Sequence, residues 1–167
     1  MAKEGSHLGR CIVLNPVDII NAKGNINSKL IKQQVHAFDI AFKLHGQIRP
    51  LIVRKVNKGH QVVDGQKMLL DLRKKGISEV FCVNLGKLTD SEYIFMRIVL
   101  NIHRSRLDYI GAAELISEIN NDGFNINSIS TRIGLSSIDT ERYAELLDFD
   151  WDDFNKRTNE IKYEKLF

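Results

Sequence analysis

The segment HQVVDGQKMLLDLRKKG, residues 60–76, has residue types suited to binding an anion. Gly65 separates a β-branched run from a short basic segment, and Lys67 follows it by two positions. The first amides of a helix lack intrahelical partners and lie at the positive end of its dipole, so this arrangement suits a phosphate. The alternative is that Gly65 only forms the turn between a strand and a helix, as at many such junctions.

Charge is distributed unevenly along the 167 residues, although the formal net charge is only +3. Nine basic residues and two acids lie from Lys43 to Lys75, whereas seven acids and one basic residue lie from Asp139 to Asp153. The first segment therefore favours phosphates and the second repels them. If the partner is DNA, which is a dense polyanion, the residues expected to contact it are Arg54, Lys55, Lys58, Arg73, Lys74, Lys75 and Arg142.

Metal and thiol chemistry have little support in the sequence. His45, His60 and His103 share no ligand spacing, and Cys11 and Cys82 match no CxxC pattern. The apolar neighbours of Cys82 predict a buried strand with a reduced, structural thiol. No apolar run approaches the roughly 20 residues that span a bilayer, so we expect a cytoplasmic protein with no membrane partner.

The elements that must position these residues alternate along the first half of the chain. Short β-branched or apolar runs predict strands, and the NKG segment, in which Asn57 and Gly59 can take positive φ, predicts a hairpin. Helical periodicity predicts helices after Ser28 and after Gly65. This pattern is typical of a domain with one small mixed sheet. The predicted strands are 11–14, 48–56, 60–65 and 79–85, and the predicted helices are 28–45 and 66–75.

The second half is helical in pattern, with a break near Asp108. Residues 129–147, ISTRIGLSSIDTERYAELL, resemble a helix-turn-helix with the small Ser130 in its first helix and Gly134 at the turn. The second helix should begin near Ser136 or Ser137. The predicted inner face is Ile129, Ile133 and Leu135, and the predicted exposed residues are Asp139, Thr140, Arg142 and Tyr143. The alternative is a two-helix scaffold that packs within the domain or contacts another protein.

Four segments in a fixed order resemble the ParB-like family, whose relatives include sulfiredoxin. The resemblance covers about residues 11–150 and implies a mixed-sheet ParB/sulfiredoxin-like domain followed by a helix-turn-helix-like domain. The segments are GQIRPLIVRK at 46–55, residues 60–76, LNIHRSRLDYIGAAEL at 100–115 and the two-helix unit. We therefore expect an α+β protein with an α/β domain at 10–89, a helical domain at 90–154 and a basic amphipathic tail at 155–167.

The resemblance also implies a nucleotide site. The family's GxxxP turn, which borders the nucleotide base, is intact from Gly46 to Pro50. The family's phosphate loop, a glycine followed by an acid and two arginines, corresponds to residues 65–68, and its ENxQR motif corresponds to residues 100–104. The implied cofactor is cytidine triphosphate with magnesium. The implied nucleotide- or anion-binding residues are Gly46, Pro50, Gly65, Gln66, Lys67, Asn101 and Arg104.

Two departures from the family pattern weaken this implication. Lys67 is the one cation where the family has two arginines, and lysine lacks the bidentate fork with which arginine holds phosphate. Leu100 stands where the family has the acid associated with magnesium and hydrolysis. We therefore expect no catalytic residue and no metal site of the chain's own. The alternative is a relic fold whose pocket is filled by Met68.

Three functions remain open on the sequence. The first is a ParB-like DNA-associated protein, in partition or transcriptional regulation, gated by a nucleotide if the degenerate site still binds one. The second is a protein-interaction adaptor that uses the acidic helical face. The third, a cytidine triphosphatase or nuclease, has the least support because the family's acid is missing. The resemblance also allows a homodimer.

Overall fold

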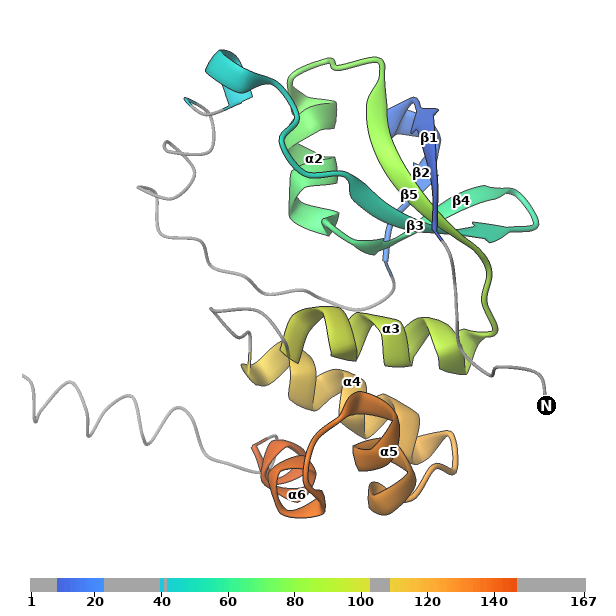
Figure 1. Ribbon diagram of the computed structural model, residues 1–167, viewed down its shortest axis with the longest axis vertical. Helices are drawn as coiled ribbons and strands as arrows, with labels where there is room; N and C mark the ends of the chain where they lie inside the picture. Colours follow the sequence, from blue (N-terminus) through green and yellow to red (C-terminus); the bar gives the residue numbers. More distant parts are fainter. Residues whose placement is uncertain (1–8, 23–39, 41, 103–108, 147–167) are drawn as a thin grey trace, which may run out of the picture.

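A mixed sheet of five strands forms the first part of the computed structural model, which describes residues 9–22, 40, 42–102 and 109–146 (Figure 1). The strand order is β1-β5-β3-β4-β2. β5 pairs antiparallel with β1 and parallel with β3, while β4 pairs antiparallel with β3 and parallel with β2. The strands are β1 Arg10–Leu14, β2 Ile19–Ile20, β3 Leu51–Val56, β4 Gly59–Asp64 and β5 Val80–Lys87.

The predicted mixed sheet and α+β class are confirmed, with three differences in detail. β2 was not predicted, because two residues are too few to show an alternating pattern. In the hairpin, Gly59 takes a φ of 117°, but no non-glycine residue in the described part of the chain has positive φ, so the expectation for Asn57 is wrong. The helix predicted from 28 to 45 lies mostly outside the described residues, within which 40 and 42–45 are helical.

Each face of the sheet is covered by a different helix (Figure 1). Helix α2 (Gln66–Lys74) buries Leu69 and Leu72 completely against one face. Helix α3 (Asp90–Ile102) covers the other face and contributes the buried Ile98. Full burial of one such side chain contributes roughly 2 kcal/mol of stability. The sheet residues packed beneath α2 are Leu51, Val53, Val62, Val80 and Cys82.

The two cysteines differ in environment as the sequence predicts for Cys82. Cys82 is 1% exposed within β5, and burial raises the pKa of its thiol to about 11. Thiols react as thiolates, so this group is inert at neutral pH and serves as a packing residue. Cys11 lies exposed on the edge strand β1.

The second half consists of helices, the first two of which pack on α3 while the third packs on those two. They are α4 (Tyr109–Asn121), α5 (Ile126–Ile133) and α6 (Ser137–Glu145). The predicted break near Asp108 lies outside the described residues, which show α3 ending at Ile102 and α4 beginning at Tyr109. A single cluster of buried residues joins the α3 face of the sheet to α4 and α5. The division into domains at residue 89 remains a prediction.

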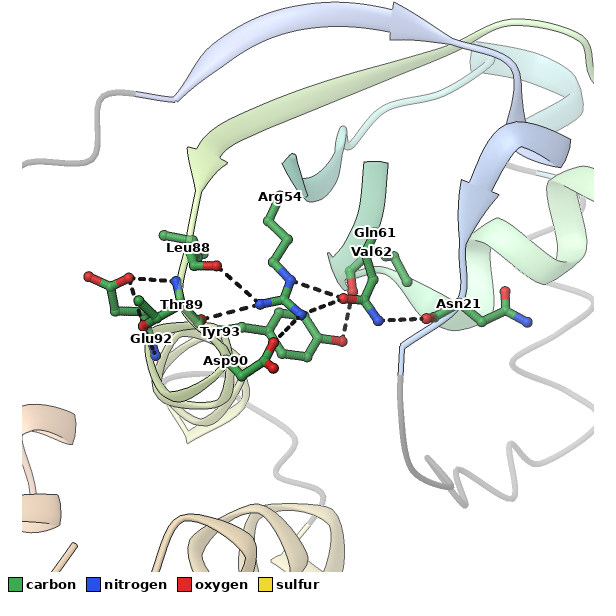
Figure 2. Close-up of polar contacts among 9 residues, drawn as sticks. All are labelled: Asn21, Arg54, Gln61, Val62, Leu88, Thr89, Asp90, Glu92 and Tyr93. Atoms are coloured by element: carbon green, nitrogen blue, oxygen red, sulfur yellow. Dashed lines mark hydrogen bonds and ion pairs between the residues drawn. The ribbon is translucent and has the colours of Figure 1, made fainter. Parts of the chain in front are cut away.

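Arg54 connects the hairpin to the start of α3 (Figure 2). It is 4% exposed, and its guanidinium lies 3.9 Å above the centre of the Tyr93 ring. Its Nε and Nη2 donate to Gln61 Oε1 at 2.9 and 2.7 Å, and Nη2 also donates to Asp90 Oδ1 at 2.7 Å. Its Nη1 donates to the carbonyl oxygens of Leu88 and Thr89 at 3.3 and 3.2 Å. All five N–H groups of the buried cation therefore have acceptors.

The acceptors of Arg54 are themselves held in place. Thr89 and Glu92 form a capping box at the start of α3, with the Thr89 amide donating to Glu92 Oε2 at 2.7 Å and the Glu92 amide donating to Thr89 Oγ1 at 3.2 Å. Gln61 Nε2 donates to the Asn21 carbonyl at 3.1 Å, and Tyr93 Oη donates to the Val62 carbonyl at 3.1 Å. Figure 2 shows this continuous network from Asn21 to the first turn of α3.

We predict that Arg54→Ala lowers the free energy of unfolding by about 2–3 kcal/mol, because it leaves buried acceptors without donors. Urea unfolding with fixed m-values measures the change. Lys55→Ala, at the neighbouring exposed position, is the matched control and should change stability by less than about 0.5 kcal/mol. The Asp90 side chain is 74% exposed, so Asp90→Asn should cost under about 1 kcal/mol. If Arg54→Ala and Lys55→Ala lowered the free energy of unfolding equally, the Arg54 network would not stabilise the fold.

Candidate functional site

The predicted phosphate loop is the junction between β4 and α2. Gly65 caps α2 with a φ of 93° and a ψ of 19°, and its carbonyl accepts from the Leu69 amide at 2.8 Å. A Cβ at this position would lie 2.7 Å from Leu51 Cδ2. Both the backbone conformation and the packing therefore require glycine here, which is the structural role that the sequence left as an alternative.

The residues after Gly65 hold the segment that follows β2. Gln66 Oε1 accepts from the Ala22 amide at 2.7 Å, so the residue in place of the family's acid is engaged in a structural contact. Lys67 is half-buried, and Met68 packs at the margin of the core beneath α2. Within this loop, Lys67 supplies the cation and α2 supplies the helix start, which together fit an anion.

Arg73 is less available to DNA than the sequence predicts. Its Nε donates to the Pro16 carbonyl at 2.9 Å, Nη1 donates to Asn21 Oδ1 at 2.7 Å, and Nη2 donates to the Ile19 carbonyl. These bonds fasten the 3-10 turn η1 (Pro16–Asp18) and β2 to α2. The guanidinium of Arg73 therefore serves the fold, and its contact with DNA remains a prediction.

The GxxxP turn is fixed to β5 by a residue that the motif leaves unspecified. Gln47 Nε2 donates to the Phe81 carbonyl at 2.9 Å, and the Phe81 amide donates to Gln47 Oε1 at 2.7 Å. The amide side chain thus pairs with β5 as a strand residue would. Gly46 has a φ of 66°, and both Gly46 and Pro50 are exposed. Sequence reasoning missed Gln47, because a polar residue in a turn gives no sign of its partner.

The third part of the predicted nucleotide site is described only up to residue 102. Asn101 is half-buried near the end of α3, and Arg104 lies outside the described residues. Leu100, in place of the family's acid, packs against the apolar core. The beginning of α2 is directed toward the side of the molecule that α3 occupies (Figure 1). Whether Arg104 joins Gly65 and Lys67 remains a prediction.

The predicted DNA-contacting residues do not form one surface. Arg54 is buried with all its donors bonded, so its assignment to a DNA surface is corrected. Lys55 and Lys58 are exposed near the β3–β4 turn, whereas Lys74 and Lys75 are exposed at the end of α2. These two places lie on opposite sides of the sheet domain (Figure 1). Lys75 Nζ also lies 5.9 Å from the centre of the Phe42 ring.

The two predicted short helices around Gly134 are confirmed as α5 and α6. Gly134 takes a φ of 75°, and Ser136 caps α6 by accepting from the Asp139 amide at 3.1 Å. Ile129 and Ile133 are buried as predicted, and Leu135 is half-buried.

Of the α6 residues predicted to be exposed, Thr140 is buried and Arg142 is exposed. Thr140 was expected to be exposed but is 0% exposed, because its Oγ1 accepts from Ser130 Oγ at 2.9 Å inside the unit. Arg142 is exposed and forms an ion pair with Asp139 at 3.4 Å. The only cation of α6 is therefore partly neutralised by an acid of the same helix.

A mainly apolar cavity of about 340 Å³ lies beside α6. Ile138, on the same helix, is 62% exposed. Apolar cavities edged by charged groups are typical of surfaces that receive a side chain of another molecule. The lining residues are Leu135, Asp139, Arg142, Tyr143 and Leu146.

The described residues contain neither a candidate metal cluster nor a candidate membrane-spanning helix. Across residues 9–22, 40, 42–102 and 109–146, no three His, Cys, Asp or Glu side chains are grouped so that they could hold a metal ion. Over the same ranges, no helix combines the length and the apolar character needed to cross a bilayer.

Comparison with known proteins identifies the fold. No family model and no curated protein matches the sequence. Several solved structures do match. One is the C-terminally truncated chromosome-partitioning protein ParB from Caulobacter crescentus, complexed to the centromeric parS site. Its TM-score is 0.55 at 14% sequence identity, and the match covers 89% of this chain and 78% of that one. The same protein complexed with CTP-gamma-S has a TM-score of 0.50 at 16% identity, covering 86% and 82%. A pNOB8-like ParB N-domain has a TM-score of 0.58 at 14% identity, covering 93% and 70%. The chain therefore has the ParB-like fold.

We predict that Gly65→Ala destabilises the protein more than Gly76→Ala does. Both glycines have positive φ, which costs an L-residue about 1–2 kcal/mol. At Gly65 the added Cβ also meets the Leu51 side chain, and such overpacking typically costs about 1–3 kcal/mol more. At Gly76 no atom lies within 4 Å of the added Cβ. Urea midpoints of the two variants measure the difference. Equal destabilisation would show that the Leu51 contact does not restrict the loop.

Proposed function

We propose that this chain is a ParB-like DNA-associated binding protein, acting in partition or in transcriptional regulation. The observation that supports this most is the order of its parts: a mixed-sheet domain followed by a two-helix unit, in the fold of ParB proteins. One of the similar structures is a ParB complexed to its centromeric DNA site. We interpret α5 and α6 as a helix-turn-helix that has kept the architecture of a DNA reader.

Binding is proposed to depend on the sheet domain more than on α6. Duplex DNA is a dense line of negative charge, and affinity arises largely from lysine and arginine contacts to phosphates. Helix α6 presents Asp139, Glu141 and Glu145, and its Arg142 is paired with Asp139. The exposed lysines of the sheet domain meet no such repulsion.

A nucleotide is proposed to act at the start of α2 without being hydrolysed. Gly65 and Lys67 fit a phosphate group, and Gly46 and Pro50 would border the base in the place that the resemblance assigns. Magnesium does not fit the donor set, because Leu100 offers no oxygen and Gln66 Oε1 is bonded to the Ala22 amide. One of the similar ParB structures contains a cytidine triphosphate analogue, which makes that nucleotide the first to test.

A second candidate function is a protein-interaction adaptor, which the cavity beside α6 favours. Its lining is mainly apolar but includes Asp139 and Arg142, and Ile138 on the same helix is exposed. These features suit an apolar anchor with a polar flank better than a phosphate backbone. On this proposal α6 contacts a protein partner, and its acids, which repel DNA, keep this surface available for that partner.

The test is binding of a mixed-sequence duplex over a series of salt concentrations, with and without cytidine triphosphate. We predict that reversing the four lysines Lys55, Lys58, Lys74 and Lys75 to glutamate abolishes binding, whereas Arg142→Ala changes affinity less than about twofold. Circular dichroism and thermal melts control for folding.

Three outcomes would contradict parts of this proposal. A wild-type chain that binds no duplex contradicts the DNA function and leaves the adaptor. Loss of a sequence-specific shift in Arg142→Ala alone would make α6 the reader. Binding that cytidine triphosphate leaves unchanged contradicts nucleotide gating but not DNA association.

A further inference from the structure

The pairing of the strands gathers basic residues at the hairpin end of the sheet. Lys55 of β3 lies opposite His60 of β4 and opposite Lys87 of β5. Arg10 of β1 lies opposite Asn84 of β5, and Asn84 in turn contacts His60. Cross-strand partners point to the same side of a sheet. The register of β5 against β3 shifts between Val53 and Lys55, so Asn84 and Lys87 both lie on the side of Lys55 although they are three residues apart.

This face is open at the hairpin end. The beginning of β1, the end of β5 and the β3–β4 turn lie together at one end of the sheet, and α2 covers the other end (Figure 1). Arg10, Lys55, Lys58 and Lys87 are all exposed. The acids of the α3 helix start, Asp90 among them, lie on the opposite face, where Asp90 pairs with Arg54.

Basic side chains outnumber acids at the hairpin end, where the exposed Asp18, which precedes β2, is the acid beside the turn. The four longer strands contain one acid, Asp64, at the far end of β4. Within the described part of the chain, no ion pair involves Arg10, Lys55, Lys58 or Lys87. Like charges opposite each other on a sheet repel, and Lys55 and Lys87 are such a pair. An anion placed between them would relieve that repulsion.

His60 and Asn84 complete the face as neutral hydrogen-bonding groups. Asn84 Oδ1 accepts from the Gly86 amide at 2.9 Å, which turns its Nδ2 toward His60 Nε2 at 3.3 Å. His60 Nε2 then accepts, and the proton lies on Nδ1. The pKa of His60 is lowered, first by burial and then by Lys55. Both causes favour the neutral imidazole, which has one N–H donor.

We propose that the hairpin end of the sheet, formed by Arg10, Lys55, Lys58, Lys87 and His60 and here termed the hairpin face, binds the phosphate backbone of duplex DNA. The inference deepens the proposed function and rests on it. The end of α2 is the weaker candidate, because Arg73 there is bonded to backbone carbonyls and Lys75 lies over Phe42. Contacts of this kind hold phosphates without reading bases, so binding at the hairpin face is independent of sequence.

The experiment compares two double charge reversals of equal size in the full chain. Lys55→Glu/Lys87→Glu should weaken binding of a mixed-sequence duplex at least about tenfold and reduce the slope of log affinity against log salt by about 2, because each lysine that no longer neutralises a phosphate removes about one unit. Lys74→Glu/Lys75→Glu is the matched control and should weaken binding less than about threefold. Lys55→Gln/Lys87→Gln, which removes repulsion, should keep or raise the melting temperature and still weaken binding.

The outcomes distinguish failure of the proposed function from failure of the hairpin face. A wild-type chain that binds no duplex contradicts the proposed function itself. If the wild type binds and both reversals weaken it equally, the effect is one of net charge and the hairpin face is overturned. It is also overturned if only the α2 reversal weakens binding, or if the Lys55→Gln/Lys87→Gln variant stays folded and binds as tightly as the wild type.

Discussion

A buried guanidinium needs an acceptor for each of its N–H groups, and this requirement at Arg54 organises the sheet domain. The acceptors come from β4, from the segment before α3 and from α3 itself, so the hairpin and the helix cannot shift independently. Gln61 extends the same network to Asn21. Because side chains alternate along a strand, turning Arg54 toward α3 turns Lys55 to the opposite face. The buried cation and the exposed basic face are therefore two consequences of one strand register.

The charges of this fold are separated between the two faces of the sheet and between the sheet and α6. Acids gather on α6 and at the start of α3, while the hairpin face has cations from several strands. A duplex approaching this molecule meets attraction at the sheet and repulsion at α6. On the proposed function, this separation would let the ParB-like fold keep a two-helix unit while its phosphate contacts lie on the sheet.

Local sequence signals were sufficient for much of the fold. The hairpin, α2 and the α5–α6 pair were predictable because each depends on neighbours in the chain: alternating residues, a glycine at a turn, and a serine that caps a helix. Side-chain partners distant in sequence were not predictable. Gln47 pairs with Phe81, and Thr140 is buried by Ser130, although nothing near either residue indicates it.

The candidate site was predictable in position more than in detail. Charge alone placed Arg54, Arg73 and Lys55 together, and only the strand register and the distant acceptors show that the two arginines serve the fold. Lys87, which the fold brings opposite Lys55, lay outside the basic run that the sequence displays. Gly65 was correctly placed at a helix start, where its required conformation explains the residue whether or not an anion binds.

Ultraviolet crosslinking of the full chain to a mixed-sequence duplex, with the linked peptides identified by mass spectrometry, tests the central claim most directly. The account predicts crosslinks in the peptides that contain residues 55–60 and 84–87, and their disappearance as salt is raised. Crosslinks confined to residues 137–146, unchanged by salt, would contradict it.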